Sequence, residues 1–473
     1  MENHYDVLVI GGGPGGTPAA MALAQAGKKT LIAEAGAGLG GTCLFEGCVP
    51  SKIFRETAER LRDIARSQEF GIDLPQEMIK LNWGRVQRRK RAILKRRSEE
   101  AIHKATQLIN LQIVFGRAQL RGSRTAFITP TQGDGSGMEI SFEQCILATG
   151  STPNALPING ADLPQVYSSD SILDIDDIPE QLVVIGGGPI GVELAQIFHA
   201  LGAKVTLMEM EPHILSIVDS ELALALEQRL IQQGIGLQLS CKIRGIRKGD
   251  QGVFVDYDTI LGSNSIFTTA VLAATGRSPR IHGLGLESTA VKSGRHGVEV
   301  DETLQTAERG IYAVGDVVGQ PMFAHWATAQ GLAVAQHLIG IPVKFPKPEH
   351  NTATIFSTPE LCMAGLTEAQ AANAGIEVSA AHYDFAQDAR AQISGQDNGL
   401  LKIVYEKKSR RVVGVHILVE DAADLMGEAA LLVSSGLTLE AISGAIHPHP
   451  TLTESFGIAA RTALSTEMAK LRM

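Results

Sequence analysis

Tyr5-Asp-Val-Leu-Val-Ile10 leads directly into Gly11-Gly-Gly13-Pro-Gly-Gly16, and Gln181-Leu-Val-Val-Ile185 leads in the same way into Gly186-Gly-Gly188-Pro-Ile-Gly191. In both places an apolar run of β-strand length ends at a glycine-rich turn, and a stretch of helix-forming residues follows. One such pattern is weak evidence, but two copies with matching flanks are hard to obtain by chance. We therefore expect two similar units of strand, glycine turn, helix and strand.

The glycines of each unit suit a turn that binds a dinucleotide. The first glycine makes the tight bend, the second lets a pyrophosphate approach the backbone, and the third packs the helix onto the strand. The N-terminus of the helix then stabilises the phosphate charge. The six positions are Gly11, Gly13 and Gly16 in the first unit and Gly186, Gly188 and Gly191 in the second. Glycine turns of an ordinary α/β protein are the alternative, which the duplication disfavours.

An acidic residue follows each first glycine at the same distance of 23 positions (11 to 34 and 186 to 209). Glu34 and Glu209 are each expected to accept hydrogen bonds from the hydroxyl groups of an adenosine ribose. Glu209 would repel a ribose 2′-phosphate, and residues 210–213 supply no Arg or Lys to attract one. The second unit is therefore expected to prefer NAD over NADP.

The composition limits the class of protein. The chain has 473 residues, of which 44% are hydrophobic and 20% charged, enough for about three globular domains. A net charge of −9 gives no basic field for nucleic acid or an anionic membrane. The first strand begins so close to Met1 that no signal peptide is expected, and no apolar run reaches membrane-spanning length. We expect a cytoplasmic protein, with a removed transit peptide as the open alternative.

Two cysteines follow the first unit in Gly40-Gly-Thr-Cys43-Leu-Phe-Glu-Gly-Cys48-Val-Pro50. Their spacing allows a disulfide across one helical turn or a tight loop. Pro50 fits the first position of a new helix, which would place Cys48 at the positive helix end and lower its pKa. Metal binding is the rival, but no second Cys or His pair with zinc spacing follows, so no metal site is expected. Cys145, Cys241 and Cys362 lie in apolar stretches and are expected in the core.

The motifs taken together resemble the pyridine nucleotide-disulfide oxidoreductase family, and most closely its members that oxidise dihydrolipoyl groups with NAD. The resemblance covers nearly the whole chain. It is carried by the two glycine units, the cysteine loop ending in Pro50-Ser-Lys52, Ala148-Thr-Gly-Ser151, Ala274-Thr-Gly-Arg277, Gly315-Asp316, Phe356-Ser-Thr-Pro-Glu360 and His447-Pro-His449-Pro-Thr-Leu-Thr-Glu454.

The resemblance implies an α/β fold with two Rossmann-like nucleotide-binding domains, for FAD and NAD, and a C-terminal α+β dimerisation domain. The expected limits are 1–152 for the FAD-binding domain, 153–277 for the NAD-binding domain, 278–345 for a central segment that completes the FAD site, and 346–473 for the interface domain. A homodimer is implied, with a lipoyl group or lipoylated protein as substrate and with no nucleic acid or membrane partner.

The resemblance also assigns the catalytic residues. Cys43 is the interchange thiol that the substrate attacks, and Cys48 is the charge-transfer thiolate against the flavin. His449 is the acid/base that reaches the cysteines of the other subunit, and Glu454 orients it. An imidazole that accepts the proton of a dithiol makes the nucleophile. Thr451-x-x-Glu454 also reads as a helix capping box, and a structural role is favoured for His447.

Further cofactor contacts are implied by position. Lys52 and Glu193 match an ion pair beside the flavin ring. Asp316 matches the contact to the ribityl chain, and Ala324 and His325 match contacts to the ring; a helix-start residue bonded to its own backbone is the alternative for His325. The remaining expected contacts are Gly116, Thr149, Gly150, Ser151, Gly276 and Arg277.

Three residues depart from the family pattern and leave the substrate open. Glu46 places an anion beside Cys43, which would disfavour the thiolate; Trp326 replaces a polar residue, and Arg280 replaces a frequent Asn. Residues 80–97 hold nine Lys or Arg and no acid. A solvated helix face is the favoured interpretation, and a docking surface for an acidic lipoyl carrier is the alternative.

Two other functions stay open at this point. The first is an NAD(P)H-dependent reductase of glutathione-like disulfides or of mercuric ion, although Glu209 disfavours NADPH and residues 469–473 lack the paired cysteines of mercuric reductases. The second is a non-catalytic FAD- and NAD-binding protein. The joint presence of Cys43, Cys48, His449 and Glu454 disfavours it, because such a protein needs no dithiol relay.

Overall fold

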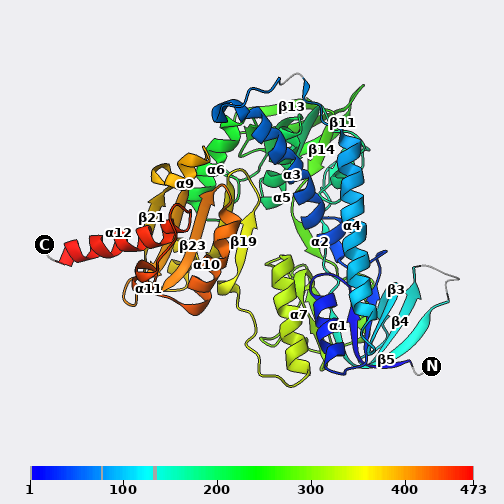
Figure 1. Cartoon of the computed structure of the whole chain (residues 1–473). Helices are drawn as coiled ribbons and strands as arrows, with labels where there is room; N and C mark the ends of the chain where they lie inside the picture. The colour runs from blue at the N-terminus through cyan, green and yellow to red at the C-terminus, as the bar shows by residue number, and fades with distance from the viewer. Residues whose placement is uncertain (1–2, 76–77, 132–135, 472–473) are drawn as a thin grey trace.

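The computed structural model describes residues 3–75, 78–131 and 136–471, with backbone only at the last two. Three main sheets follow one another along the chain (Figure 1). Within the described residues, no helix combines the length and the apolar character needed to cross a bilayer.

The first sheet contains the first glycine unit. Strands β1 and β2 are parallel, β5 and β18 extend the parallel part, and β3, β4 and β5 form an antiparallel meander. Buried residues dominate β1 and β2, as expected for parallel strands covered on both faces. The bounds are β1 His4–Ile10, β2 Thr30–Glu34, β3 Leu111–Leu120, β4 Thr125–Pro130, β5 Met138–Leu147 and β18 Ile311–Ala313.

The second sheet repeats this arrangement with the second glycine unit. Its strands are all parallel in the order β10-β9-β8-β14-β7, which matches the order β3-β2-β1-β5 of the first sheet. The bounds are β7 Val166–Ser168, β8 Gln181–Ile185, β9 Lys204–Met208, β10 Gly236–Gln238 and β14 Ala270–Ala273, with a separate antiparallel sheet of β11 Lys242–Lys248, β12 Val253–Thr259 and β13 Gly262–Thr268.

The helices of these two units cover the sheets and connect them. Helix α3 packs against both α4 and α5, so it links the first unit to the second. Helix α7 packs on α1, where a side chain at Gly331 would meet the backbone oxygen of Gly15 at 2.2 Å. The bounds are α1 Gly16–Gln25, α2 Gly41–Phe45, α3 Cys48–Ala65, α4 Trp83–Thr106, α5 Pro189–Ala200, α6 Ser220–Gln232 and α7 Ala324–Leu338.

The third sheet forms the C-terminal part, which lies apart from the first sheet (Figure 1). It is antiparallel in the order β19-β20-β23-β22-β21, and helix α10 packs on β20 and β23. The predicted fold class, two Rossmann-like units followed by an α+β domain, is therefore confirmed. The bounds are β19 Thr352–Ile355, β20 Glu360–Gly365, α8 Glu368–Asn373, β21 Val378–Asp384, α9 Ala389–Ile393, β22 Leu400–Glu406, β23 Val412–Val419, α10 Ala422–Ser435, α11 Leu439–Gly444 and α12 Glu454–Leu471.

The three cysteines expected in the core are buried there, since Cys145, Cys241 and Cys362 are 0%, 2% and 0% exposed. The basic stretch differs from its favoured interpretation at one position. Lys90 in α4 is 2% exposed and its Nζ lies 2.5 Å from Asp174 Oδ1. The pattern of charges could not reveal this, because the partner lies 84 residues away.

Candidate active site

The glycine turns of the two units have the same geometry. Gly11 and Gly186 have φ angles of +109° and +113°, which side chains other than glycine rarely adopt. A Cβ at Gly16 would lie 1.9 Å from the oxygen of Gly11, and the corresponding distance from Gly191 to Gly186 is also 1.9 Å. The helix therefore approaches the turn closely in each unit.

The middle glycines differ from these because their backbone is open. A Cβ at Gly188 would meet nothing within 4 Å, and one at Gly13 would meet only Gly41 Cα, at 3.8 Å. Helices α1 and α5 begin at or beside these turns. Open backbone at a helix N-terminus fits the pyrophosphate of a dinucleotide, so the residues present suit FAD and NAD.

The two acidic residues have equivalent contacts at the ends of β2 and β9. The Gly12 N–H donates to Glu34 Oε2 and the Gly187 N–H donates to Glu209 Oε2, each at 2.5 Å. Each second carboxylate oxygen accepts another backbone N–H, from Gly36 at 2.6 Å or from the residue two positions after Glu209 at 2.8 Å. Each carboxylate thus also braces its own glycine turn, a role that sequence spacing did not suggest.

The two Ala-Thr-Gly turns meet where the units join. Their short strands, β6 (Ser151–Pro153) and β15 (Arg277–Pro279), pair in antiparallel fashion. The Ser151 hydroxyl donates to Asp316 Oδ2 at 2.6 Å and accepts from Arg277 Nε at 2.8 Å. Arg277 also forms an ion pair with Asp170 at 2.6 Å. Nothing in the sequence around Asp170 marked it as part of this network.

The other residues predicted to contact the cofactors have roles in the backbone structure. Gly150 and Gly276 have φ angles of +73° and +94°. The Thr149 hydroxyl donates to the backbone oxygen of Arg280 at 2.7 Å. Gly116 lies in β3, where a Cβ would approach the backbone oxygen of Thr129 to 2.8 Å.

Helix α7 begins at Ala324, and the next residue connects it to the C-terminal part. His325 Nε2 donates to the backbone oxygen of Thr352, at 2.8 Å, and the ring stacks on Phe323. The alternative considered for His325, a bond to its own helix backbone, is therefore wrong. Trp326, one of the departures from the family pattern, is buried.

The two cysteines predicted to be redox-active lie on consecutive helices, a short one and a long one. Cys43 is in α2 and Cys48 is the first residue of α3, and both are free thiols. The prediction that Pro50 opens this helix is wrong by two positions. Proline lacks an N–H and is tolerated throughout the first turn, where that group has no partner within the helix. Cys48 still lies at the positive end of the helix dipole.

The environment gives the two thiols opposite properties. A hydrogen bond from Cys43 lowers the pKa of Cys48 to about 7, opposed by burial and helped by the charge of Lys52. The same hydrogen bond and burial raise the pKa of Cys43, while Lys52 and Arg97 act against this rise. The geometry therefore favours a thiolate at Cys48 and a protonated thiol at Cys43.

Lys52 and Glu193 form an ion pair between α3 and α5. Lys52 Nζ lies 2.8 Å from Glu193 Oε2, and Glu193 Oε1 accepts the backbone N–H of Phe356 at 2.9 Å. The Lys52 ammonium also lies 4.3 Å from the centroid of the Phe356 ring. Phe356 belongs to a motif that the sequence resemblance used, but no role was predicted for it.

His449 and Glu454 meet at the start of α12, of which Glu454 is the first residue. His449 Nδ1 lies 3.0 Å from Glu454 Oε2, and the same oxygen accepts the Thr451 N–H at 3.1 Å. Glu454 thus accepts the backbone hydrogen bond of the predicted capping box and holds the imidazole at the same time. The second capping-box bond is not formed, and the Thr451 hydroxyl donates to the backbone oxygen of Pro448. The Glu454 pKa is lowered, first by the Thr451 N–H and then by His449. His447 pairs instead with a carboxylate of α10, at 3.0 Å.

The His449 side chain is 72% exposed, and no contact joins it to Cys43 within the described part of the chain. Helix α12 lies far from α2 in Figure 1. One copy of the chain therefore does not bring the four predicted catalytic residues together.

Glu46 was expected to act on Cys43, but it is not among the groups with the largest effects on the Cys43 pKa. The groups that act most on the Cys43 pKa are Cys48, Lys52 and Arg97. Burial and then Asp170 raise the pKa of Glu46, and Arg280 and Arg277 lower it. The charges that act most on Glu46 are thus the Asp170 carboxylate and the two guanidinium groups at the junction of the two nucleotide units, and its pKa is raised on balance.

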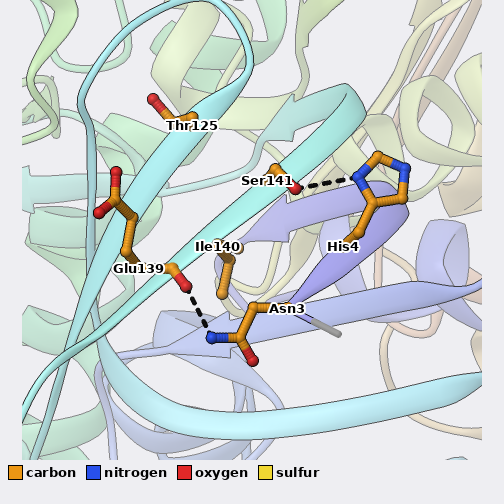
Figure 2. A pocket seen from close by; sticks show the side chains of 6 residues that line it. All are labelled: Asn3, His4, Thr125, Glu139, Ile140 and Ser141. Atoms are coloured by element: carbon orange, nitrogen blue, oxygen red, sulfur yellow. Dashed lines mark hydrogen bonds between the residues drawn. The ribbon is translucent and has the colours of Figure 1, made fainter. Parts of the chain in front are cut away.

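Two surface hollows of the described residues differ in how they relate to these positions. The larger, of about 480 Å³, lies beside β1, β4 and β5, where His4 Nδ1 is within 2.9 Å of Ser141 Oγ (Figure 2). None of the predicted site residues lines it; its lining is Asn3, His4, Thr125, Glu139, Ile140 and Ser141. A second hollow of about 280 Å³ includes His325 and Trp326.

Comparison with known proteins places these features in one family. Residues 5–331 match the pyridine nucleotide-disulphide oxidoreductase family and residues 352–460 match its dimerisation domain. The chain is 35% identical to dihydrolipoyl dehydrogenase of Geobacillus stearothermophilus over 98% of its length and 96% of the relative, and 36% identical to that of Haloferax volcanii over 97% and 96%.

Solved structures agree in fold. LpdA from Mycobacterium tuberculosis has a TM-score of 0.88 at 26% identity, and the HOCl-induced flavoprotein disulfide reductase RclA from Escherichia coli has a TM-score of 0.84 at 26% identity. Each covers 97% of this chain, and the match spans 99% of each solved chain.

Proposed function

Because the chain belongs to the pyridine nucleotide-disulphide oxidoreductase family, we propose that it is a dihydrolipoyl dehydrogenase that oxidises dihydrolipoyl groups with NAD. Members of this family use FAD and NAD(H). Two features together carry the proposal. In the Cys43–Cys48 pair the pKa of one thiol is raised and that of the other is lowered. In the His449–Glu454 pair a carboxylate holds an imidazole. A disulfide reductase related to RclA is the second candidate, favoured by similarity of structure.

Cys43, Cys48 and His449 have different roles in the proposed thiol–disulfide exchange. In the oxidised enzyme, a substrate thiolate attacks Cys43 of the disulfide, and Cys48 leaves as the thiolate that its environment stabilises. The second substrate thiol, deprotonated by His449, then displaces Cys43 and completes the lipoyl disulfide. Bound FAD supplies the acceptor for the two electrons left on the cysteines, and NAD is the final oxidant.

The nucleotide contacts follow the two units. We place FAD in residues 1–152 and 278–345, held by Gly11, Gly13, Gly16, Glu34 and Asp316. NAD is placed in residues 153–277, held by the glycine turn of α5 and by Glu209. Residues 346–473 form the interface domain. In this proposal the Lys52–Glu193 ion pair lies beside the flavin ring.

The active unit is a homodimer in this proposal, because His449 is exposed and separated from Cys43 within one chain. Mixing of two inactive variants tests this. Cys43→Ala and His449→Gln subunits should be inactive apart, and a random mixture should regain roughly a quarter of the wild-type activity because half of the dimers contain one complete site. A mixture that stays inactive after verified subunit exchange would argue against sites shared between subunits.

Activity with defined substrates tests the reaction itself. The purified flavoprotein should form NADH from NAD and dihydrolipoamide, with a long-wavelength absorbance band on anaerobic reduction that Cys48→Ser abolishes. His449→Gln should lower kcat by about 10²- to 10⁴-fold, whereas the matched control His447→Gln, whose ring pairs with α10, should change kcat much less. Reduction of glutathione-like disulfides with no turnover of dihydrolipoamide would favour the second candidate.

A further inference from the structure

The Phe356 ring lies close to two cations of helix α3. It follows strand β19, so it enters the site from the C-terminal domain. Lys52 Nζ is 4.3 Å and Arg55 Cζ is 5.3 Å from the ring centroid. Both distances are within the range in which an aromatic face attracts a cation.

The two cations differ in how firmly other groups hold them. Arg55 also reaches Glu59 at 2.6 Å and the buried Glu360 at 2.7 Å. Lys52 is 32% exposed, and among the described residues it contacts Glu193 and the Phe356 ring. A lysine ammonium on a flexible stem can turn into solvent more easily than a guanidinium held by two carboxylates. The ring therefore matters more for the position of Lys52 than for that of Arg55.

The same residue also holds the partner of Lys52. The Phe356 N–H donates to Glu193 Oε1, while Lys52 binds Oε2. Each carboxylate oxygen thus has its own donor. One residue of the C-terminal domain contacts both members of the ion pair, through its ring and through its backbone.

The position of Lys52 matters for Cys48, which lies four residues earlier on the same face of α3. The charged groups acting on Cys48 are Lys52, which favours its thiolate, and Glu193, which opposes it, in addition to the hydrogen bond from Cys43. A Lys52 ammonium displaced from Glu193 would leave the opposing charge uncompensated.

We propose that Phe356 is a positioning residue: its ring holds the Lys52 ammonium against Glu193 and thereby keeps a positive charge beside Cys48. The C-terminal domain would in this way adjust the reactivity of a thiol in the first nucleotide unit. The proposal rests on the proposed function only in taking Cys48 as the reactive thiolate.

The test measures the pH dependence of Cys48 alkylation by iodoacetamide in the reduced flavoprotein, with the modified residue identified by mass spectrometry. Phe356→Leu should move the midpoint upward by about half a pH unit and slow alkylation at pH 7 about twofold. Phe356→Tyr keeps an aromatic face and the backbone N–H, so its midpoint should match wild type. Phe356→Met replaces the leucine variant if that variant does not fold.

A double variant separates positioning from a structural effect. In a Lys52→Met background the ring has no ammonium to hold, so Phe356→Leu should leave the midpoint unchanged. An equal upward movement with and without Lys52, or an equal effect of the Leu and Tyr variants, would overturn the proposal. The assay contains no lipoyl substrate and no NAD, so failure of the proposed dehydrogenase activity would not alter its outcome.

Discussion

Replacement of Cys43 by alanine tests the source of the reactivity of Cys48. The hydrogen bond from the Cys43 thiol is the largest cause that lowers the pKa of Cys48 to about 7. Burial and Lys52 act on Cys48 in opposite directions, and both remain in the variant. Without the hydrogen bond, the pKa should return toward the ordinary cysteine value of about 8.5.

The expected effect on rate follows from the fraction of thiolate. At pH 7 a thiol of pKa 7 is half ionised, whereas one of pKa about 8.5 is roughly 3% ionised, a ratio of about 15. Alkylation of Cys48 by iodoacetamide in reduced Cys43→Ala should therefore be about 15-fold slower at pH 7 than in wild type. At pH 9.5 both proteins should react at similar rates, because the thiolate predominates in each.

Cys43→Ser is the matched control, since its hydroxyl retains a hydrogen-bond donor at the same position. Its midpoint should lie between those of wild type and Cys43→Ala. A Cys43→Ala midpoint that stays near pH 7 would refute the assignment of the effect to Cys43. The helix N-terminus and Lys52 would then be the source of the low pKa.

Three further predictions address other parts of the chain. The enzyme should use NADH more than tenfold better than NADPH, as kcat/KM, because Glu209 repels a 2′-phosphate; a smaller preference would contradict this role. Burial raises the pKa of Glu420 to about 7, above its unfolded value of about 4.3, so its contribution to stability is lost as pH rises through 7. At pH 8 the melting temperature of Glu420→Gln, measured by differential scanning fluorimetry, should therefore be about 2 °C higher than that of wild type. Near pH 4 the two melting temperatures should be the same. A higher melting temperature of the variant at pH 4 only would contradict the predicted sign. Reversal of the exposed Arg88, Arg89 and Arg91 of α4 to Glu should slow turnover of a lipoylated protein and not of free dihydrolipoamide, and equal slowing of both would exclude docking.

Local patterns were sufficient for much of the fold. The glycine turns after β1 and β8 need positive φ angles and close helix packing, which glycine alone allows, so the residues themselves specify the two units. The Cys43–Cys48 loop was equally visible, because both residues lie within six positions of one another. The opposite pKa shifts of the two thiols also depend on charged groups from distant parts of the chain, which the sequence does not place near them.

Contacts between distant segments were decided only by the tertiary structure. Lys52 and Glu193 are 141 residues apart, and the resemblance rather than any spacing rule paired them. The contact between Phe356 and Lys52 likewise exists only because the chain folds so that the residue after β19 lies beside α3. Lys90 belongs to a basic run but is buried, because an acceptor 84 residues away satisfies its charge. By itself the sequence determined the turns and the dithiol, whose requirements are local, while folding alone decided which charges surround them, because electrostatic interactions depend on distance in space.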